Sequence, residues 1–284
     1  MLILRTVQDI QSWLTFHSAK GSSIGFVPTM GALHAGHISL IDRAKRENHL
    51  TVCSIFVNPT QFNDAKDLEK YPRTLESDSL LLSNARCDVL FYPSIAEIYP
   101  PGLAQVKVDL KGLDLVMEGA HRPGHFEGVV QVVHRLLDIV RPDRLYMGQK
   151  DFQQFTIIGH MIKELNLPVQ LVVCPISREP HGLAMSSRNE RLSTEGRKQA
   201  AFICSTLSKA IDMKNTMKPE QICLQLFDEL NQDPFKPEYV DIVGADDLLP
   251  IKTWTDSPVV ICTAVWLEGI RLIDNIILSF AAKE

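Results

Sequence analysis

The first two-thirds of the chain alternates short apolar runs, rich in β-branched residues, with stretches of helical periodicity. The clearest run is Leu50–Val57, which has the composition of a strand covered on both faces. Further strands are predicted at 23–27, 88–92, 144–147 and 169–175, with an edge strand at 105–110. Helices are predicted at 37–48, from Pro72 onward, at 127–140 and at 150–166, with a polar loop at 58–71. This alternation predicts an α/β fold, a parallel sheet with helices on both faces, which binds ligands at the carboxyl ends of its strands.

The pattern changes near Ile176. Beyond it the sequence predicts helices at 194–213 and 218–230, followed by strands at 238–243, 258–266 and 270–278. These elements fit a smaller C-terminal α+β domain. The predicted domains are therefore 1–176 and 177–284.

Composition excludes several classes of protein. Hydrophobic residues make up 45% and charged residues 22% of the 284, which is ordinary globular usage. The net charge of −5 argues against a protein that binds nucleic acid over its whole surface. The six cysteines form no C-x-x-C pair and are interpreted as small buried apolar residues. Arg5 and Asp9 interrupt any signal peptide, and no run approaches 18 apolar residues, so we expect a cytoplasmic protein with no membrane or nucleic-acid partner.

The sharpest local signal is the segment PTMGALHAGH, residues 28–37, between a predicted strand and a predicted helix. His34 and His37, three residues apart at a helix start, point toward the same place. Free backbone N–H groups and the helix dipole favour an anion there, and Gly31 and Gly36 leave room for a nucleotide. The plainer alternative is that one histidine caps the helix and the other is exposed.

This segment resembles the H-x-G-H signature of nucleotidylyltransferases and class I aminoacyl-tRNA synthetases, which cleave ATP between its α- and β-phosphates. Such enzymes carry a second basic loop, and MSSRN at 185–189 is similar to it. Two hydroxyls and a guanidinium offer several donors to phosphate oxygens. Taken alone, Ser-Ser-Arg is also compatible with an ordinary turn.

Other polar segments follow predicted strands or precede predicted helices. Lys150, in the sequence GQKD, is predicted to begin a helix, where its charge opposes the helix dipole and so favours a functional role over simple solvation. Asn58 and Gln61, in NPTQFN at 58–63, offer neutral amides suited to a small hydroxy acid. Gln154, one turn after Lys150, offers another. The alternative is that such polar residues are only solvated. Asp78 is considered either as a magnesium ligand through water or as an exposed helical residue. Arg122 and His125 are considered as partners of a carboxylate.

Six motifs in order carry a more specific resemblance: VPTMGALHAGH, IFVNPTQF, YPRTLESD, RPGHFEGV, MGQKDFQQ and GLAMSSRN. They cover residues 24–190 and are similar to the pantoate–β-alanine ligase family, also called the pantothenate synthetases. The resemblance implies a Rossmann-like ATP- and pantoate-binding domain, a C-terminal lid domain, Mg²⁺ with ATP as substrate, and a homodimer. His181 departs from the family, in which Asp is expected before the glycine, so the charge of this loop and its response to pH are in doubt.

The resemblance also implies residue roles. The implied catalytic residues are His37, as proton donor, together with His34, Lys150 and Arg188. The implied ATP contacts are Met30, Gly31, Ala32, Leu33, His34, Ala35, Gly36, His37, Gly148, Gln149, Lys150, Asp151, Ser177, Met185, Ser186, Ser187 and Arg188. Gln61 and Gln154 correspond to glutamines that bind pantoate, with Gln61 also bordering the β-alanine site. Metal ligands are unknown.

The predicted reaction joins pantoate to β-alanine through a pantoyl adenylate, releasing pyrophosphate and then AMP. The main rival is another H-x-G-H adenylyltransferase, which would transfer AMP to a phosphate acceptor without needing an amine. A non-catalytic nucleotide- or RNA-binding module is the other alternative, and the acidic net charge argues against it.

Overall fold

The computed structural model describes residues 1–62 and 65–278, and its contacts divide the chain into two units. The first unit comprises Met1–Lys111, Arg122–Gln149 and Ile157–Pro175. The second comprises Gly112–His121, Lys150–Thr156 and Ile176–Glu284. Two short segments from the middle of the chain therefore belong with its C-terminal part.

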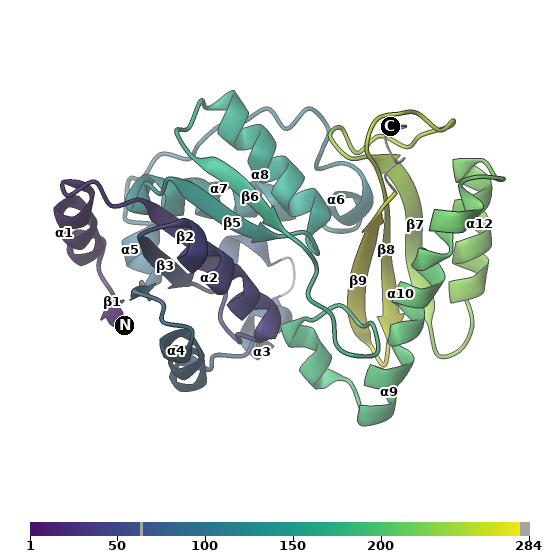
Figure 1. Ribbon diagram of the computed structural model, residues 1–284, viewed down its shortest axis with the longest axis horizontal. Helices are drawn as coiled ribbons and strands as arrows, with labels where there is room; N and C mark the ends of the chain where they lie inside the picture. The colour runs from purple at the N-terminus through teal and green to yellow at the C-terminus, as the bar shows by residue number, and fades with distance from the viewer. Residues whose placement is uncertain (63–64, 279–284) are drawn as a thin grey trace. The chain divides into compact units, whose positions relative to one another are not determined.

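A parallel six-stranded sheet forms the centre of the first unit, as the alternating sequence pattern predicts (Figure 1). In chain order its strands are β1 (Leu2–Leu4), β2 (Ile24–Thr29), β3 (Leu50–Ile55), β4 (Val89–Phe91), β5 (Arg144–Gly148) and β6 (Gln170–Cys174). In space they stand in the order β1-β4-β3-β2-β5-β6. The order reverses beside β2, whose neighbours are β3 and β5, so the carboxyl ends of β2 and β5 form the switch point at which such sheets bind ligands.

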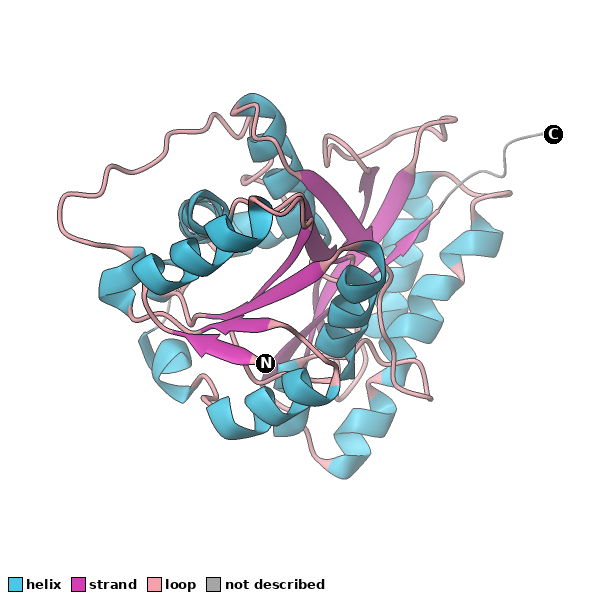
Figure 2. Ribbon diagram, turned by 60° about the vertical axis from the view of Figure 1, so that its left-hand side comes forward, coloured by secondary structure: helices cyan, strands magenta, loops and turns pink. Residues whose placement is uncertain are grey.

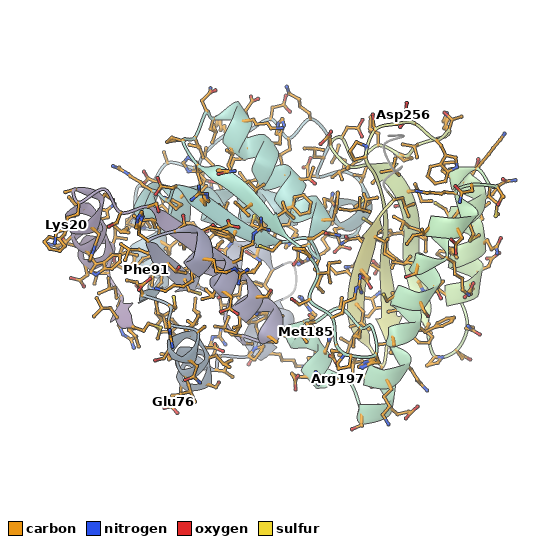
Figure 3. All side chains as sticks on the ribbon, viewed as in Figure 1. Lys20, Glu76, Phe91, Met185, Arg197 and Asp256 are labelled. Atoms are coloured by element: carbon orange, nitrogen blue, oxygen red, sulfur yellow. The ribbon has the colours of Figure 1, made fainter. Side chains whose placement is uncertain are left out.

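Helices cover both faces of this sheet (Figure 2). They are α1 (Val7–Ser18), α2 (Ala35–Glu47), α3 (Ala65–Lys70), α4 (Leu75–Asn84), α5 (Ile95–Ile98), α7 (His125–Val140) and most of α8 (Phe152–Glu164). Ile41 and Ala44 of α2 are fully buried against β-strand residues such as Val27. Each large aliphatic side chain buried in this way stabilises the fold by about 1.5–3 kcal/mol. Figure 3 shows the same partition, with Phe91 inside and the charged Lys20 and Glu76 at the periphery.

The second unit contains the antiparallel sheet β7 (Lys236–Gly244), β8 (Val259–Leu267) and β9 (Ile270–Ile277), in that order. The helices of its C-terminal part are α9 (Thr194–Gln199), α10 (Ala201–Ser208), α11 (Ala210–Met213) and α12 (Pro219–Leu230). Of these, α10, α11 and α12 contribute to a buried cluster against one face of the sheet, which includes Leu207, Leu226 and Leu272 (Figure 1). The predicted α+β character of this region is confirmed.

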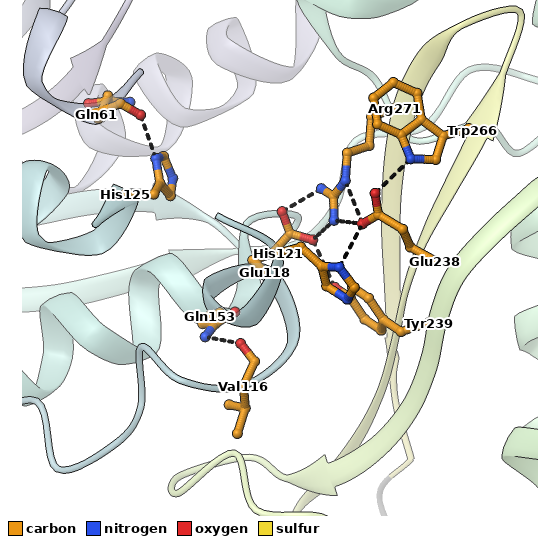
Figure 4. Close-up of polar contacts among 10 residues, drawn as sticks. All are labelled: Gln61, Val116, Glu118, His121, His125, Gln153, Glu238, Tyr239, Trp266 and Arg271. Carbon is orange, nitrogen blue, oxygen red and sulfur yellow. Dashed lines mark hydrogen bonds and ion pairs between the residues drawn. The ribbon is translucent and has the colours of Figure 1, made fainter. Parts of the chain in front are cut away.

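The opposite face of β9 meets the segment Gly112–His121, which contains α6 (Met117–His121). Arg271 of β9 donates to both carboxylate oxygens of Glu118, at 2.6 and 2.9 Å, and the Tyr239 hydroxyl donates to the same carboxylate at 2.9 Å (Figure 4). Gln153 of α8 donates to the carbonyls of Leu113 and Val116, at 2.6 and 2.9 Å. These bonds explain why 112–121 and 150–156 group with the C-terminal sheet.

Several element boundaries differ from the sequence predictions. The segment 105–110 is not a strand, because Gln131 of α7 accepts from the N–H of Val106 and donates to its carbonyl. Pro72 does not begin a helix; α4 begins at Leu75, where the Thr74 hydroxyl bonds Asp78. The predicted loop at 58–71 contains the 3₁₀ turn η1 (Pro59–Gln61) and α3, and the predicted helix at 194–213 is divided at Ala200 and Lys209.

The elements β1, α1, α5 and α6 were not predicted from the sequence. Among the described residues no helix has both the length and the apolar character needed to cross a bilayer. All six cysteines are free thiols; four are buried, and Cys204 and Cys223 are partly exposed.

Candidate active site

The histidine loop, Met30–His37, joins β2 to α2 at the switch point of the six-stranded sheet. Gly31 and Ala32 have φ angles of +84° and +50°. A left-handed backbone at a residue with a Cβ atom costs of order 1 kcal/mol or more, so the loop needs support. Asp78 of α4 provides it, because its carboxylate accepts from the N–H groups of Ala32 (3.0 Å) and Leu33 (2.8 Å).

Asp78 does not lie on an exposed helix face, which is one of the positions considered for it. It is 1% exposed, and its oxygens also accept from the Thr74 hydroxyl at 3.2 Å. The carboxylate is therefore directed at the protein's own loop. In the described part of the chain no group of three or more His, Cys, Asp and Glu side chains is arranged to hold a metal ion.

The two histidines form a reciprocal cap at the start of α2. Nδ1 of His34 accepts from the N–H of Gly36 at 3.1 Å, and Nδ1 of His37 accepts from the N–H of His34 at 3.3 Å. The ring centroids lie 4.1 Å apart. Because Nδ1 accepts in each ring, a neutral imidazole here carries its proton on Nε2. Capping therefore involves both rings. The sequence led us to expect free backbone N–H groups for an anion, but the N–H of Gly36 is bonded to His34.

Gln61 lies beside the histidine loop at the end of η1. The residue is 9% exposed, its Nε2 lies 3.2 Å from Sδ of Met30, and its Oε1 accepts from Asn58 at 3.1 Å. His125 bonds the backbone carbonyl of Gln61 through Nδ1 at 2.8 Å (Figure 4). His125 thus supports the backbone of Gln61.

Asn58 has a structural part in the same group. It is 1% exposed, donates to the carbonyl of Gly128 at 3.1 Å and accepts from the Tyr99 hydroxyl at 2.9 Å. Burial raises the pKa of Tyr99, which keeps this hydroxyl protonated as a donor. The sequence suggested that the Asn58 amide binds a substrate. In the structure the amide instead makes these contacts within the protein. Asn63, the last residue of that motif, lies outside the described residues.

A cavity of about 450 Å³ opens beside the histidine loop in the first unit. Met30, Gly31 and Asp78 line it together with Phe56, and Arg73 is also part of its wall. The cavity lies at the carboxyl ends of β2, β3 and β4 and is large enough for a small ligand. Its lining includes the first residues of the histidine loop but not His34, His37 or Gln61.

The segment GQKD begins at Gly148, the last residue of β5, which is the neighbour of β2. Gly148 and Gln149 belong to the first unit, and the N–H of Gln149 is bonded to the carbonyl of Cys174 at 2.8 Å. The sequence predicted that Lys150 begins the helix, but α8 begins at Phe152. Lys150 lies in a turn directly before Asp151, whose carbonyl accepts a hydrogen bond from the N–H of Phe155 at the start of α8.

In the second unit the chain forms a tight hairpin between Ser177 and Met185, joined by a hydrogen bond from the N–H of Met185 to the carbonyl of Ser177 at 2.9 Å. The serine loop, Met185–Arg188, follows directly. Ser186 accepts from the N–H of Arg188 at 3.2 Å and begins the 3₁₀ helix η2 (Ser187–Arg191). His181, at the tip of the hairpin, has its Nε2 3.0 Å from the carbonyl of Arg197 and 3.7 Å from Glu179.

The predicted site residues thus form two groups. In the first unit the histidine loop, Gln61 and Gly148–Gln149 stand at the carboxyl edge of the parallel sheet. In the second unit are Lys150, Asp151, the half-buried Gln154, Ser177 and the serine loop. The positioning role of Asp78 was not predicted from the sequence; the signal for it was an acidic residue in the first turn of a helix that follows a neighbouring strand.

Comparison with known proteins shows the family of this chain. The model of the pantoate-beta-alanine ligase family matches residues 2–277. A pantothenate synthetase from Cytophaga hutchinsonii is 47% identical over 284 residues, which is 98% of this chain and 99% of that protein.

Solved structures agree as well. A pantothenate synthetase from Thermus thermophilus has a TM-score of 0.90 at 39% identity, covering 99% of this chain and 100% of that one. A pantoate-beta-alanine ligase from Francisella tularensis, complexed with beta-gamma ATP and beta-alanine, has a TM-score of 0.82 at 36% identity and covers 99% of both chains. The chain belongs to the pantoate–β-alanine ligase family.

Proposed function

We propose that this protein joins (R)-pantoate to β-alanine at the expense of ATP, giving pantothenate, AMP and pyrophosphate. The observation that carries the proposal is the pair of imidazoles at the start of α2, both protonated on Nε2 when neutral, beside a buried glutamine. Membership of the ligase family supports it.

In the first half-reaction a carboxylate oxygen of pantoate attacks the α-phosphorus of ATP, and the bond to the bridging oxygen of pyrophosphate breaks. No protein nucleophile is required. Catalysis depends on alignment and on donors that stabilise negative charge on the phosphate oxygens. We assign this task to His34, His37, Lys150 and Arg188, with His37 as the proton donor.

In the second half-reaction the β-alanine amine attacks the carbonyl carbon of pantoyl adenylate, and AMP leaves. We propose that Gln61 and Gln154 bind the hydroxyl and carboxylate groups of pantoate through their amides. A mixed anhydride hydrolyses readily in water, so exclusion of water between the two steps is part of the proposed role of residues 177–284, with 1–176 binding ATP and pantoate.

We propose that Mg²⁺ enters with ATP as part of the substrate. Mg²⁺ is usually bound through one or two carboxylates together with substrate phosphates and water, and the Asp78 carboxylate accepts three hydrogen bonds from the protein. A homodimer in the cytoplasm is the assembly and location that the family resemblance supports.

Exchange of labelled pyrophosphate into ATP tests the proposal. Exchange should require pantoate, and AMP should accumulate only when β-alanine is added as well. Exchange without pantoate, or AMP release that ignores the amine, would refute it and favour an adenylyltransferase with a phosphate acceptor.

A further inference from the structure

Strand β9 carries two buried polar residues in succession, Asp274 and Asn275, which are 4% and 2% exposed. Successive side chains of a strand point to opposite faces of its sheet. Leu272, and Asp274 two residues later, share the face that packs against the helices, whereas Arg271 and Asn275 share the face that meets the segments 112–121 and 150–156.

Asn275 reaches the turn before α8. Its Nδ2 donates to the backbone carbonyl of Lys150 at 3.0 Å. A buried amide hydrogen bond of this kind fixes the orientation of the peptide group that follows Cα of Lys150, and so restrains the point from which the lysine side chain starts. The Lys150 side chain is long and loses considerable rotamer freedom when it is held in one place, so fixing its backbone reduces the number of bonds left to order.

Asp274 reaches the hairpin that precedes the serine loop. Its carboxylate accepts from both terminal nitrogens of Arg178, at 2.7 and 2.9 Å, and Arg178 also donates to the carbonyl of Gly182 at 3.0 Å. Burial by itself would lower the pKa of Arg178, but the hydrogen bonds and charge of Asp274 outweigh it and raise that pKa. This bidentate pair fixes the hairpin whose two ends are Ser177 and Met185.

We propose that β9 positions both ATP-binding segments of the second unit, the turn at Lys150 through Asn275 and the serine loop through Asp274. Neither residue is assigned a contact with substrate; each acts through the segment that it holds. The inference rests on the proposed function, because it takes Lys150 and Arg188 as donors to ATP. It adds two residues that lie outside the six motifs, in the part of the chain whose sequence carries no signature.

A double-mutant cycle on Lys150 and Asn275 tests the first contact. Asn275→Ala should lower the rate of pantoate-dependent pyrophosphate exchange at saturating ATP by roughly 10- to 100-fold, the scale of a small misplacement of a catalytic group. In a Lys150→Ala background the same substitution should change the rate by less than about twofold. Losses that multiply independently would show that Asn275 does not act through Lys150.

The isosteric Asn275→Asp variant guards against a folding defect, because it keeps the volume of the side chain and removes the donor to the Lys150 carbonyl. It should show the same loss of exchange rate. Ile273→Val, two residues earlier on the same face of β9, is the matched control for disturbed packing and should retain the wild-type rate. Thermal unfolding of each variant shows that the rates refer to folded protein.

Asp274→Asn tests the second contact, since it removes the charge opposite Arg178 and one of the two acceptors. We expect kcat/KM for ATP to fall at least about tenfold, with a further change of less than about twofold in an Arg188→Ala background. Failure of Lys150→Ala and Arg188→Ala to impair exchange would overturn the proposed function of those donors. Impairment by these two, with wild-type rates for the Asn275 and Asp274 variants, would overturn only the role of β9.

Discussion

At the level of single residues, the histidine loop is shaped by one buried carboxylate and two imidazoles. Asp78 holds the left-handed turn at Gly31 and Ala32, and the imidazoles of His34 and His37 then cap the helix that follows. The same hydrogen bonds that cap α2 assign the proton of each neutral ring to Nε2. Local structure and proposed chemistry therefore depend on one set of contacts.

His37→Ala removes one preorganised donor. The rate of pantoate-dependent pyrophosphate exchange should fall roughly 10²- to 10³-fold, the usual loss for such a donor. The substitution also removes a cap bond worth about 1 kcal/mol, so urea unfolding should be measured on the same sample. A folded variant with wild-type exchange would contradict the role of His37.

Each of the two carboxylate oxygens of Asp78 accepts from one backbone N–H group. Asp78→Asn replaces one of these oxygens with an N–H₂ group, so one backbone N–H loses its acceptor. Leaving a buried donor without its acceptor should lower the free energy of unfolding by about 1–3 kcal/mol. ATP affinity measured by calorimetry should fall as well, because the histidine loop loses its support. Glu76→Gln, an exposed position on the same helix, is the control and should change neither quantity.

At the level of elements, α7 sets the position of η1. Gly128 lies so close to this turn that a Cβ atom built on it would stand 2.5 Å from the carbonyl oxygen of Thr60 and 2.9 Å from Cα of Gln61. The missing side chain thus allows the helix to approach the backbone of a proposed pantoate-binding residue. Gly128 is the final glycine of the motif RPGHFEGV. The structure shows that a glycine is needed there for close packing, which the sequence pattern did not reveal.

Gly128→Ala should push η1 away from α7 and so raise KM for pantoate about tenfold or more, since a shift of about 1 Å at a binding group has effects of this order. ATP affinity should stay within about twofold of the wild type. Gly159→Ala on α8 is the control, because its Cβ would meet only the end of the flexible Leu171 side chain, at 3.3 Å. Equal effects of the two substitutions on KM for pantoate would refute this role for Gly128.

At the level of the whole molecule, ion pairs join parts of the chain that lie far apart in sequence. Arg271 and Glu118 are separated by 153 positions, yet they form two hydrogen bonds, and Glu238 accepts from the same guanidinium at 2.6 Å. Burial by itself would raise the pKa of Glu238, but hydrogen bonds from Arg271 and Trp266 outweigh it and lower that pKa below its ordinary value of 4.5.

This pKa shift predicts a loss of stability in acid. The stabilisation from Glu238 is complete above pH 4.5 and is lost as the pH falls from 4.5 through the lowered pKa, because the unfolded chain binds the proton first as the pH falls. At about pH 7 the variant Glu238→Gln should be less stable than the wild type by about 1.5–3 kcal/mol in urea unfolding, the range for hydrogen bonds to a charged group. The gap should narrow below pH 4.5, and a gap that is constant with pH would contradict the assignment.

Much of this organisation could be predicted from local sequence. The β-branched run at 50–57 and the periodicity of 127–140 predicted a strand and a helix because burial requires such patterns. The prediction of a strand at 105–110 was wrong. The alternation of residues fits a strand, but both backbone polar groups of Val106 are hydrogen-bonded to the side chain of Gln131, from a distant helix. Lys150 was wrongly placed at the start of α8, since a helix start depends on which carbonyl accepts its first bond.

The sequence by itself determined the class of fold, the family and the segments that carry the chemistry, because these depend on periodicity and on residue types at fixed spacing. Only the tertiary structure decided which side chains support those segments. Asp78, Gly128, Asp274 and Asn275 contact residues that are 45 to 125 positions away in the chain, and contacts at such separation leave no local pattern. The physical reason is that packing and hydrogen bonding depend on proximity in space, which the chain acquires only when it folds.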